Sequence, residues 1–200
     1  MTTHLFVLID ESRSMLPQKE IVLDAINEWS SMLSDGDHIS AYSFNHGFKC
    51  HFDRITRSEG DITVFFQDHY EPRGTTSLYD AMYKVLQFID KTTDDKIIFL
   101  IVTDGYDNSS RDHSRYDVHD EMKRMKRFEV VFVGSNHDAV LHGEQLGIPR
   151  RSCLKYDDDN FDVAVNATTE AIRRFKTGDS RYIYFTSDDR RRSSSSGDEI

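Results

Sequence analysis

Two uniformly apolar runs, each closed by an aspartate, constrain the fold more than any other part of the sequence. Leu5–Ile9 is followed directly by Asp10, and Ile97–Val102 leads through a threonine into Asp104. A strand that is apolar at every position is covered on both faces, as in a parallel sheet between two layers of helices. Ligands of such sheets bind beyond the carboxyl ends of the strands. We therefore expect both aspartates at one functional edge of a sheet.

The remaining patterns alternate between helix and strand along the chain. Apolar residues recur at helical spacing in the segments at about 17–33, 78–89, 116–127, 138–146 and 161–175. Further strand patterns cover residues 39–44, 48–52, 130–133 and 154–156, with a hairpin turn at 45–47. This alternation predicts an α/β fold with a Rossmann-like doubly wound sheet, mostly parallel with one antiparallel edge strand, and helices on both faces. Residues 61–70 fit either a short helix or an extended segment.

We expect one domain followed by a short extension. The 200 residues are enough to bury the core of a single domain, which we expect to cover residues 1–178. Residues 179–200 form a C-terminal extension that is polar and contains a run of arginines and serines. Since almost nothing in this run is apolar, we expect it to be disordered from about residue 186.

Charge and composition disfavour several classes of function. The formal net charge of -10 argues against a sequence-independent nucleic-acid binder, which needs a basic footprint, and against an anionic membrane surface as partner. No apolar run reaches the length of a membrane span, and the first residues lack the pattern of a signal peptide, so we expect a cytoplasmic protein. Cys50 and Cys153 form no CxxC pattern and the histidines no HExxH spacing, so neither a zinc site nor a disulfide framework is expected.

Oxygen-bearing side chains gather in three segments next to predicted strands and helices. They are the Asp-x-Ser-x-Ser stretch at residues 10–14, the Gly-Thr-Thr-Ser loop at 74–77 and the Thr-Asp-Gly stretch at 103–105. A carboxylate and two hydroxyls so close together suit Mg²⁺ or Mn²⁺, because these hard cations prefer carboxylate, hydroxyl and water oxygens over sulfur or imidazole. We expect all three segments at the same sheet edge, where they can share one ion.

These segments, taken in order, resemble the metal-ion-dependent adhesion site of the von Willebrand factor type A domain, and the resemblance covers roughly residues 4–177. It implies the metal ligands Asp10, Ser12, Ser14, Thr76 and Asp104. Thr75 competes with Thr76, which is preferred because Leu78 and the following Ala-Met pair fall where the family places small and apolar helix residues. Residues 133–139 and 143–148 look like segments of bacterial and phage members, and a phage-encoded protein would work in the host cytoplasm.

The resemblance implies a metal-dependent protein–protein interaction module without catalytic activity. A Mg²⁺ or Mn²⁺ ion held largely by neutral hydroxyls keeps much of its charge, so a glutamate or aspartate of a partner protein is expected to fill its open position. Single-domain members of the family look like adaptors of larger assemblies, such as AAA+ machines or phage and bacterial complexes. The expected rim of the partner-binding surface contains Arg13, His46 and Tyr106.

Two alternatives from other classes also combine an α/β fold with an aspartate and Mg²⁺. A phosphatase or phosphotransfer enzyme of the haloacid-dehalogenase type resembles Asp-x-Asp, whereas Ser12 stands at the second position here, so the general acid is missing. A receiver domain would use Asp10 and Glu11 as its acidic pair, but Asp104 comes too late for its phosphoacceptor. Neither G-x-G-x-x-G nor G-x-x-x-x-G-K-S/T occurs, so nucleotide binding has no support in the sequence.

Overall fold

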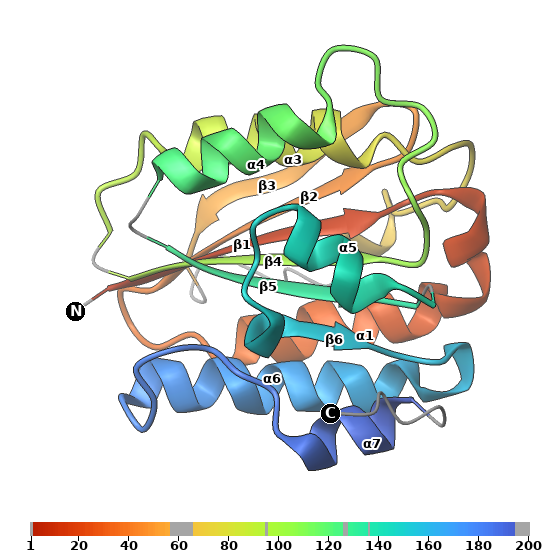
Figure 1. Ribbon diagram of the computed structural model, residues 1–200. Helices are drawn as coiled ribbons and strands as arrows, with labels where there is room; N and C mark the ends of the chain where they lie inside the picture. Colours follow the sequence, from red (N-terminus) through yellow and green to blue (C-terminus); the bar gives the residue numbers. More distant parts are fainter. Residues whose placement is uncertain (1, 57–65, 95, 126–127, 136, 195–200) are drawn as a thin grey trace.

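One six-stranded sheet forms the centre of the computed structural model, which describes residues 2–56, 66–94, 96–125, 128–135 and 137–194 (Figure 1). The strands in these residues are β1 (Thr3–Asp10), β2 (His38–Phe44), β3 (Phe48–Ile55), β4 (Lys96–Thr103), β5 (Glu129–Gly134) and β6 (Cys153–Lys155). Their order is β3-β2-β1-β4-β5-β6, and every neighbouring pair is parallel except β2 and β3. The predicted mostly parallel sheet with one antiparallel edge strand is confirmed.

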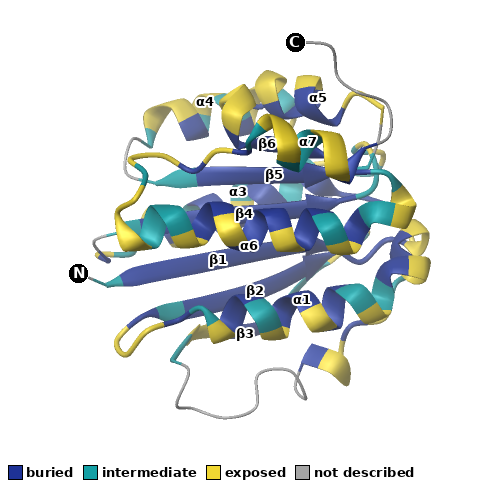
Figure 2. Cartoon of the chain, turned by 90° about the horizontal axis from the view of Figure 1, so that it is seen from below, coloured by how far each residue is buried: buried dark blue, intermediate teal, exposed yellow. Residues whose placement is uncertain are grey.

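Helices cover both faces of this sheet. In the described residues the α-helices are α1 (Lys19–Ser31), α3 (Leu78–Ile89), α4 (Arg115–Arg124), α5 (Ala139–Gln145), α6 (Phe161–Thr177) and α7 (Ser187–Ser193). Short 3-10 helices occur at η1 (Arg13–Gln18), η3 (Arg150–Ser152) and η4 (Asp158–Asn160). Helices α1 and α6 lie on one face, and α3, α4 and α5 lie on the other (Figures 1 and 2). None of the helices in the described residues is long and apolar enough to cross a membrane.

The central strand β1 explains why its sequence is apolar at every position. Leu5 and Val7 belong to the core on the side of α1 and α6, whereas Phe6 belongs to the core on the side of α3. Successive side chains of a strand point to opposite faces, so a strand covered on both faces needs apolar residues throughout. Ile9 of β1 pairs with Val102 of β4, which brings the carboxyl ends of these two strands side by side.

The segment before α3 connects the core on the side of α1 and α6 to this edge. Of the ambiguous residues 61–70, residues 61–65 lie outside the described part of the chain. Phe66 is buried, with its ring 5.3 Å from the ring of Tyr70. The hydroxyl of Tyr70 donates a hydrogen bond of 2.7 Å to the backbone carbonyl of Asp10, so this segment supports the end of β1.

The C-terminal extension is more ordered than its composition predicts. We expected disorder from about residue 186, but residues 187–193 form α7. A capping box closes the first turn of this helix, because Thr186 and Asp189 each bind the backbone N–H group of the other. The prediction was therefore wrong for residues 187–194, and residues 195–200 lie outside the described part of the chain.

Hydrogen bonds to the body of the domain explain this difference. The guanidinium of Arg190 donates hydrogen bonds of 2.8 Å to the backbone carbonyls of Cys153 and Arg150. The hydroxyl of Ser193 is buried and donates to the carbonyl of Lys155 at 2.9 Å. Polar side chains that satisfy backbone groups in this way stabilise a helix that buries little apolar surface. A prediction from composition alone counts the same side chains as solvated.

Candidate metal centre

The predicted oxygen ligands come from three segments that meet at the carboxyl edge of β1 and β4. Asp10 is the last residue of β1, and Ser12 and Ser14 follow it at the start of η1. Asp104 directly follows β4, the strand that neighbours β1. Thr76 lies just before α3. These positions agree with the expectation that the ends of neighbouring parallel strands carry the site.

Direct contacts join four of the five predicted ligands. The hydroxyl oxygens of Ser12 and Ser14 lie 3.0 Å apart, and Ser14 donates a hydrogen bond of 2.8 Å to Oδ1 of Asp104. The backbone N–H of Ser12 donates to Oδ1 of Asp10 at 2.7 Å. The Asp-x-Ser-x-Ser stretch therefore curls back on its own aspartate and reaches the aspartate of the next strand.

Burial raises the pKa of both carboxyl groups in this cluster. Asp10 is completely buried, and its pKa is raised to about 6 because desolvation outweighs the hydrogen bonds from Thr103 and Ser12 that favour the charged form. Desolvation also raises the pKa of Asp104, although the hydrogen bond from Ser14 opposes the shift. A cation bound between these groups would favour their charged forms and so reverse this tendency.

Thr76 faces the same loops, whereas its neighbour Thr75 is exposed. The side chain of Thr76 is buried, and its hydroxyl lies 3.8 Å from the position that a Cβ atom on Gly105 would occupy. Two backbone hydrogen bonds of 2.9 Å join Thr76 to Asn108, one to the side-chain Oδ1 and one from the backbone N–H. Of the two candidate threonines, Thr76 is thus the one held against the loop that follows β4.

The donor set suits a hard divalent cation. All five predicted ligands offer oxygen atoms, which Mg²⁺ and Mn²⁺ prefer. The described residues contain no group of three or more His, Cys, Asp or Glu side chains that could hold a metal ion, so any ion at this edge needs the hydroxyl groups as well. The hydroxyl groups of Thr103 and Ser14 donate side-chain hydrogen bonds to Asp10 and Asp104, respectively.

The three predicted rim residues also lie at this edge, Arg13 at the start of η1 and the other two in loops. Arg13 is exposed, and its backbone N–H donates to the carbonyl of Gly74 at 3.3 Å. His46 packs so closely against Gly74 that a Cβ atom there would lie 2.6 Å from its Nδ1 atom. Tyr106 is half exposed, and its hydroxyl donates to Asp138 at 3.3 Å. Arg13 and His46 therefore share one wall of the rim, and Tyr106 belongs to another.

Two residues that support the cluster were not predicted. The hydroxyl of Thr103 donates to Oδ2 of Asp10 at 2.7 Å and so occupies the second carboxylate oxygen. Glu11 is buried and accepts hydrogen bonds from Lys49 at 2.9 Å and from the backbone of Glu71 at 2.7 Å. Thr103 could have been found in the sequence. The strand β4 begins with a lysine and is then apolar at every position until it ends in this polar residue. Lys49 reaches Glu11 from β3 and Glu71 from the segment before α3, and no local pattern specifies either contact.

The fold is that of an α/β domain in which a cluster of oxygen-bearing side chains lies at the carboxyl ends of β1 and β4. The chain belongs to the von Willebrand factor type A domain family, because a profile of that domain matches residues 4–188. Members of this family are often metal-dependent and mediate protein interactions. No curated protein matches the chain significantly.

Solved structures of similar fold agree with this membership. Proximal thread matrix protein 1 from the mussel byssus, with a zinc-occupied MIDAS motif, has a TM-score of 0.70 and 16% identity, covering 88% of this chain and 48% of that chain. A von Willebrand factor type A structure from Catenulispora acidiphila has a TM-score of 0.64 and 14% identity, covering 85% and 43%. BatB from Bacteroides thetaiotaomicron has a TM-score of 0.59 and 13% identity, covering 89% and 100%. The chain thus spans about half the length of the mussel protein, and the likeness shows a shared fold.

Proposed function

We propose that this protein is a metal-dependent protein–protein interaction module. In this proposal a Mg²⁺ or Mn²⁺ ion is held by Asp10, Ser12, Ser14, Thr76 and Asp104. The observation that supports it most is the continuous contact from Ser12 through Ser14 to Asp104, which gathers oxygen ligands from two neighbouring strand ends. The zinc-occupied MIDAS motif of the mussel protein lends further support, because that protein has a similar fold.

The chemistry of the donors suggests what the ion would bind. Three of the five ligands are neutral hydroxyls, which leave much of the charge of the ion uncompensated. Mg²⁺ takes six ligands and exchanges water at positions that the protein leaves open. When bound, the ion would supply a strong local attraction for a carboxylate. We therefore propose that the partner is a protein that presents a glutamate or aspartate to this edge, with Arg13, His46 and Tyr106 around it.

The proposal includes a role without catalysis. Ser12 stands where a haloacid-dehalogenase-type enzyme would need a second carboxylate, and its hydroxyl is in contact with Ser14. Both oxygens of the Asp10 carboxylate already accept hydrogen bonds from Ser12 and Thr103. We propose that the protein acts as a cytoplasmic adaptor in a larger bacterial or phage assembly, such as one built around an AAA+ ATPase.

Calorimetric titration of Mg²⁺ and of Mn²⁺ into the full chain tests the metal site. We expect saturable binding by the parent protein and a loss of affinity of more than about tenfold in Asp10→Ala, because a coordinating carboxylate matters at least as much as an outer-shell partner. Asp120→Ala is the matched control, since Asp120 is an exposed aspartate on α4 and should leave binding unchanged.

Circular dichroism of all three proteins shows whether each is folded. A folded parent that binds neither ion, or an Asp10→Ala variant that binds as tightly as the parent, would contradict the proposal. If binding is confirmed, pull-down experiments with and without EDTA then test whether partner capture depends on the metal.

A further inference from the structure

A buried tyrosine at the carboxyl edge of the sheet has a hydroxyl group that the domain itself does not use. Tyr156 directly follows β6, and its side chain is completely buried in the core on the side of α1 and α6. Its ring packs against that of Phe161, with ring centres 4.8 Å apart. The hydroxyl oxygen of Tyr156 forms no hydrogen bond with any residue that the structure describes. Because a buried hydroxyl without a partner costs free energy, this group calls for a partner that the described residues do not supply.

The register of the sheet places Tyr156 in one row with the predicted metal ligand Asp104. The last residues of β4, β5 and β6 pair with one another across the sheet, and the next residues are Asp104, Ser135 and Tyr156. Backbone hydrogen bonds continue this row. The N–H group of Ser135 donates to the carbonyl of Thr103 at 3.3 Å, and that of Tyr156 donates to the carbonyl of Gly134 at 3.0 Å. Asp104 and Tyr156 therefore lie two strand spacings apart, each of about 4.8 Å, on the same face of the sheet.

The charges that act on the Tyr156 hydroxyl include those of the predicted metal site. Burial raises the pKa of Tyr156 well above its ordinary value, and the carboxylate charge of Asp104 adds to this effect. Asp158 and Asp10 act in the same direction. Ser135 opposes them, but its hydroxyl donates to the backbone carbonyl of Asp104 at 3.1 Å and forms no hydrogen bond with Tyr156. The phenol thus lies within electrostatic reach of two predicted metal ligands, Asp104 and Asp10.

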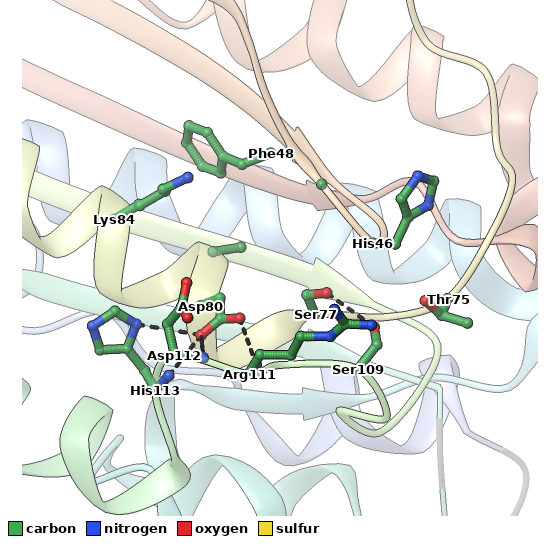
Figure 3. Close-up of a pocket in the computed structure, with 12 residues that line it drawn as sticks. His46, Phe48, Thr75, Ser77, Asp80, Lys84, Ser109, Arg111, Asp112 and His113 are labelled. Atoms are coloured by element: carbon green, nitrogen blue, oxygen red, sulfur yellow. Dashed lines mark hydrogen bonds and ion pairs between the residues drawn. The ribbon is translucent and has the colours of Figure 1, made fainter.

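Polar side chains on the α3 side of the site provide a contrast. A cavity of about 370 Å³ lies there, lined by residues of α3, of the β2–β3 hairpin and of the loop that follows β4 (Figure 3). In its wall the hydroxyl oxygens of Ser77 and Ser109 lie 2.9 Å apart. The carboxylate of Asp80 accepts a hydrogen bond of 2.8 Å from the backbone N–H group of Arg111. These polar groups have partners within the chain, whereas the hydroxyl of Tyr156 does not find one among the described residues.

We infer that Tyr156 is a positioning residue of the metal centre, whose hydroxyl binds a water molecule that the ion holds on the side of Asp104. This inference rests on the proposed function of the metal centre. Mg²⁺ usually keeps several waters and is bound through only one or two carboxylates, so part of its contact with the protein runs through water. A phenol hydroxyl can donate to such a water or accept from it. Groups that hold the ligands of a metal ion in place contribute about 10- to 100-fold to its affinity.

Calorimetric titration of Mg²⁺ into the full chain and into its Tyr156→Phe variant tests this inference. Phenylalanine keeps the ring that packs against Phe161 and removes only the hydroxyl group. We expect the Mg²⁺ affinity of the variant to fall about tenfold, because the water of the ion loses one of its partners. In EDTA the Tm of the variant should equal or exceed that of the parent, because the substitution removes no hydrogen bond to a described residue.

Tyr42→Phe is the matched control. Tyr42 is also a buried tyrosine, but its hydroxyl donates a hydrogen bond of 2.8 Å to Asp53, which joins β2 to β3. We expect the opposite pattern in this variant, with a lower Tm in EDTA and an unchanged affinity for Mg²⁺. A difference between the two variants therefore separates the loss of a contact to the water of the ion from a general loss of structure.

Each outcome separates this inference from the proposed function. If the parent binds Mg²⁺ and Tyr156→Phe binds it equally tightly, the inference is wrong while the proposed function stands, because the hydroxyl then serves no water of the ion. A Tm of Tyr156→Phe in EDTA well below that of the parent would also overturn the inference, since the hydroxyl would then have its partner within the protein. If the parent binds neither Mg²⁺ nor Mn²⁺, the proposed function fails and the inference fails with it.

Discussion

The two edges of the sheet treat their carboxylates in opposite ways. At the amino edge, Asp94 accepts two hydrogen bonds from the guanidinium of Arg54, at 2.6 and 3.1 Å, and one from Thr92 at 2.7 Å. Although burial would raise the pKa of Asp94, these partners hold it well below its usual range. At the carboxyl edge, burial dominates and raises the pKa of Asp10 to about 6. At the amino edge the carboxylate is bound by a guanidinium, whereas at the carboxyl edge Asp10 and Asp104 accept hydrogen bonds from neutral groups.

This difference separates stability from function within one fold. A buried charge with a complete set of partners makes the native structure more specific, and removing one partner is costly. Functional sites commonly accept unfavourable burial, which reduces stability until a ligand binds. We therefore expect changes at the amino edge to affect unfolding, and changes at the carboxyl edge to affect binding first.

The amino edge also shows how misleading a local geometry can be. His4 contacts Asp94 through Nδ1 at 3.1 Å and Ser40 through Nε2 at 2.8 Å, which is the order of groups in a serine hydrolase. Ser40 is completely buried, however, and its hydroxyl also donates to Asp53 at 2.8 Å. A nucleophile that no substrate can reach has no catalytic use. The arrangement ties β1, β2 and β3 together.

The largest expected effect is a loss of stability at the amino edge. Asp94→Ala leaves Arg54 and His4 without their carboxylate, and we expect it to lower the free energy of unfolding by about 3 kcal/mol. Urea denaturation at pH 7 measures this change, with Asp120→Ala as an exposed control expected to stay within about 0.5 kcal/mol of the parent. Metal titration of the same variant should give the parent affinity. A loss of stability below about 1 kcal/mol would show that this network contributes little.

A smaller effect on stability, of opposite sign, is expected at the carboxyl edge. The pKa of Asp10 is raised from 3.8 to about 6, so its charged form reduces stability above pH 6 and this cost disappears as the pH falls. In EDTA at pH 7 we expect Asp10→Asn to be about 1–2 kcal/mol more stable than the parent, because the amide carries no charge. Thermal unfolding should also show that Mg²⁺ stabilises the parent and leaves the variant unchanged. A variant that is less stable than the parent in EDTA would contradict the comparison.

The smallest effect concerns the pH dependence of stability that arises from His4 at the amino edge. Burial lowers the pKa of His4 from 6.5 to about 4, although Asp94 opposes the shift. The unfolded chain therefore binds more protons than the native protein between these values, and the parent loses stability as the pH falls from 6.5 to 4. In His4→Gln we expect this loss between pH 6.5 and 5 to be smaller by about 1 kcal/mol. The opposing contribution of Asp10 is shared by both proteins, so identical pH slopes would rule out His4 as the titrating group.

The fold was predictable because its central strands are covered on both faces. The apolar runs at 5–9 and 97–102 predict β1 and β4, and each is followed within two residues by an aspartate at the carboxyl edge of the sheet. The helices on either side follow from apolar residues at helical spacing, because burial of one face determines that spacing. Ser12 and Ser14 also follow directly from the sequence, since their distance from Asp10 along the chain is short.

The contacts that depend on distant parts of the chain could not be predicted in this way. Lys49 and Glu71 meet Glu11 only because the hairpin and the segment before α3 fold back over the end of β1. Asp80 meets the backbone of Arg111 only because the loop after β4 is bound to the start of α3. Each of these residues looks like an ordinary surface charge in the sequence. Their roles depend on tertiary packing, which the spacing of apolar residues does not encode.

Helix α7 also has a consequence for how copies of the protein meet. The outermost strand β6 is only three residues long, and an unpaired strand at the edge of a sheet is a template for pairing with another chain. Arg190 and Ser193 occupy the carbonyls of Cys153 and Lys155 at the two ends of this strand. The polar C-terminal segment thereby acts as a cover that protects the sheet from edge-to-edge aggregation. A chain shortened before residue 186 would lose this protection while keeping every predicted metal ligand.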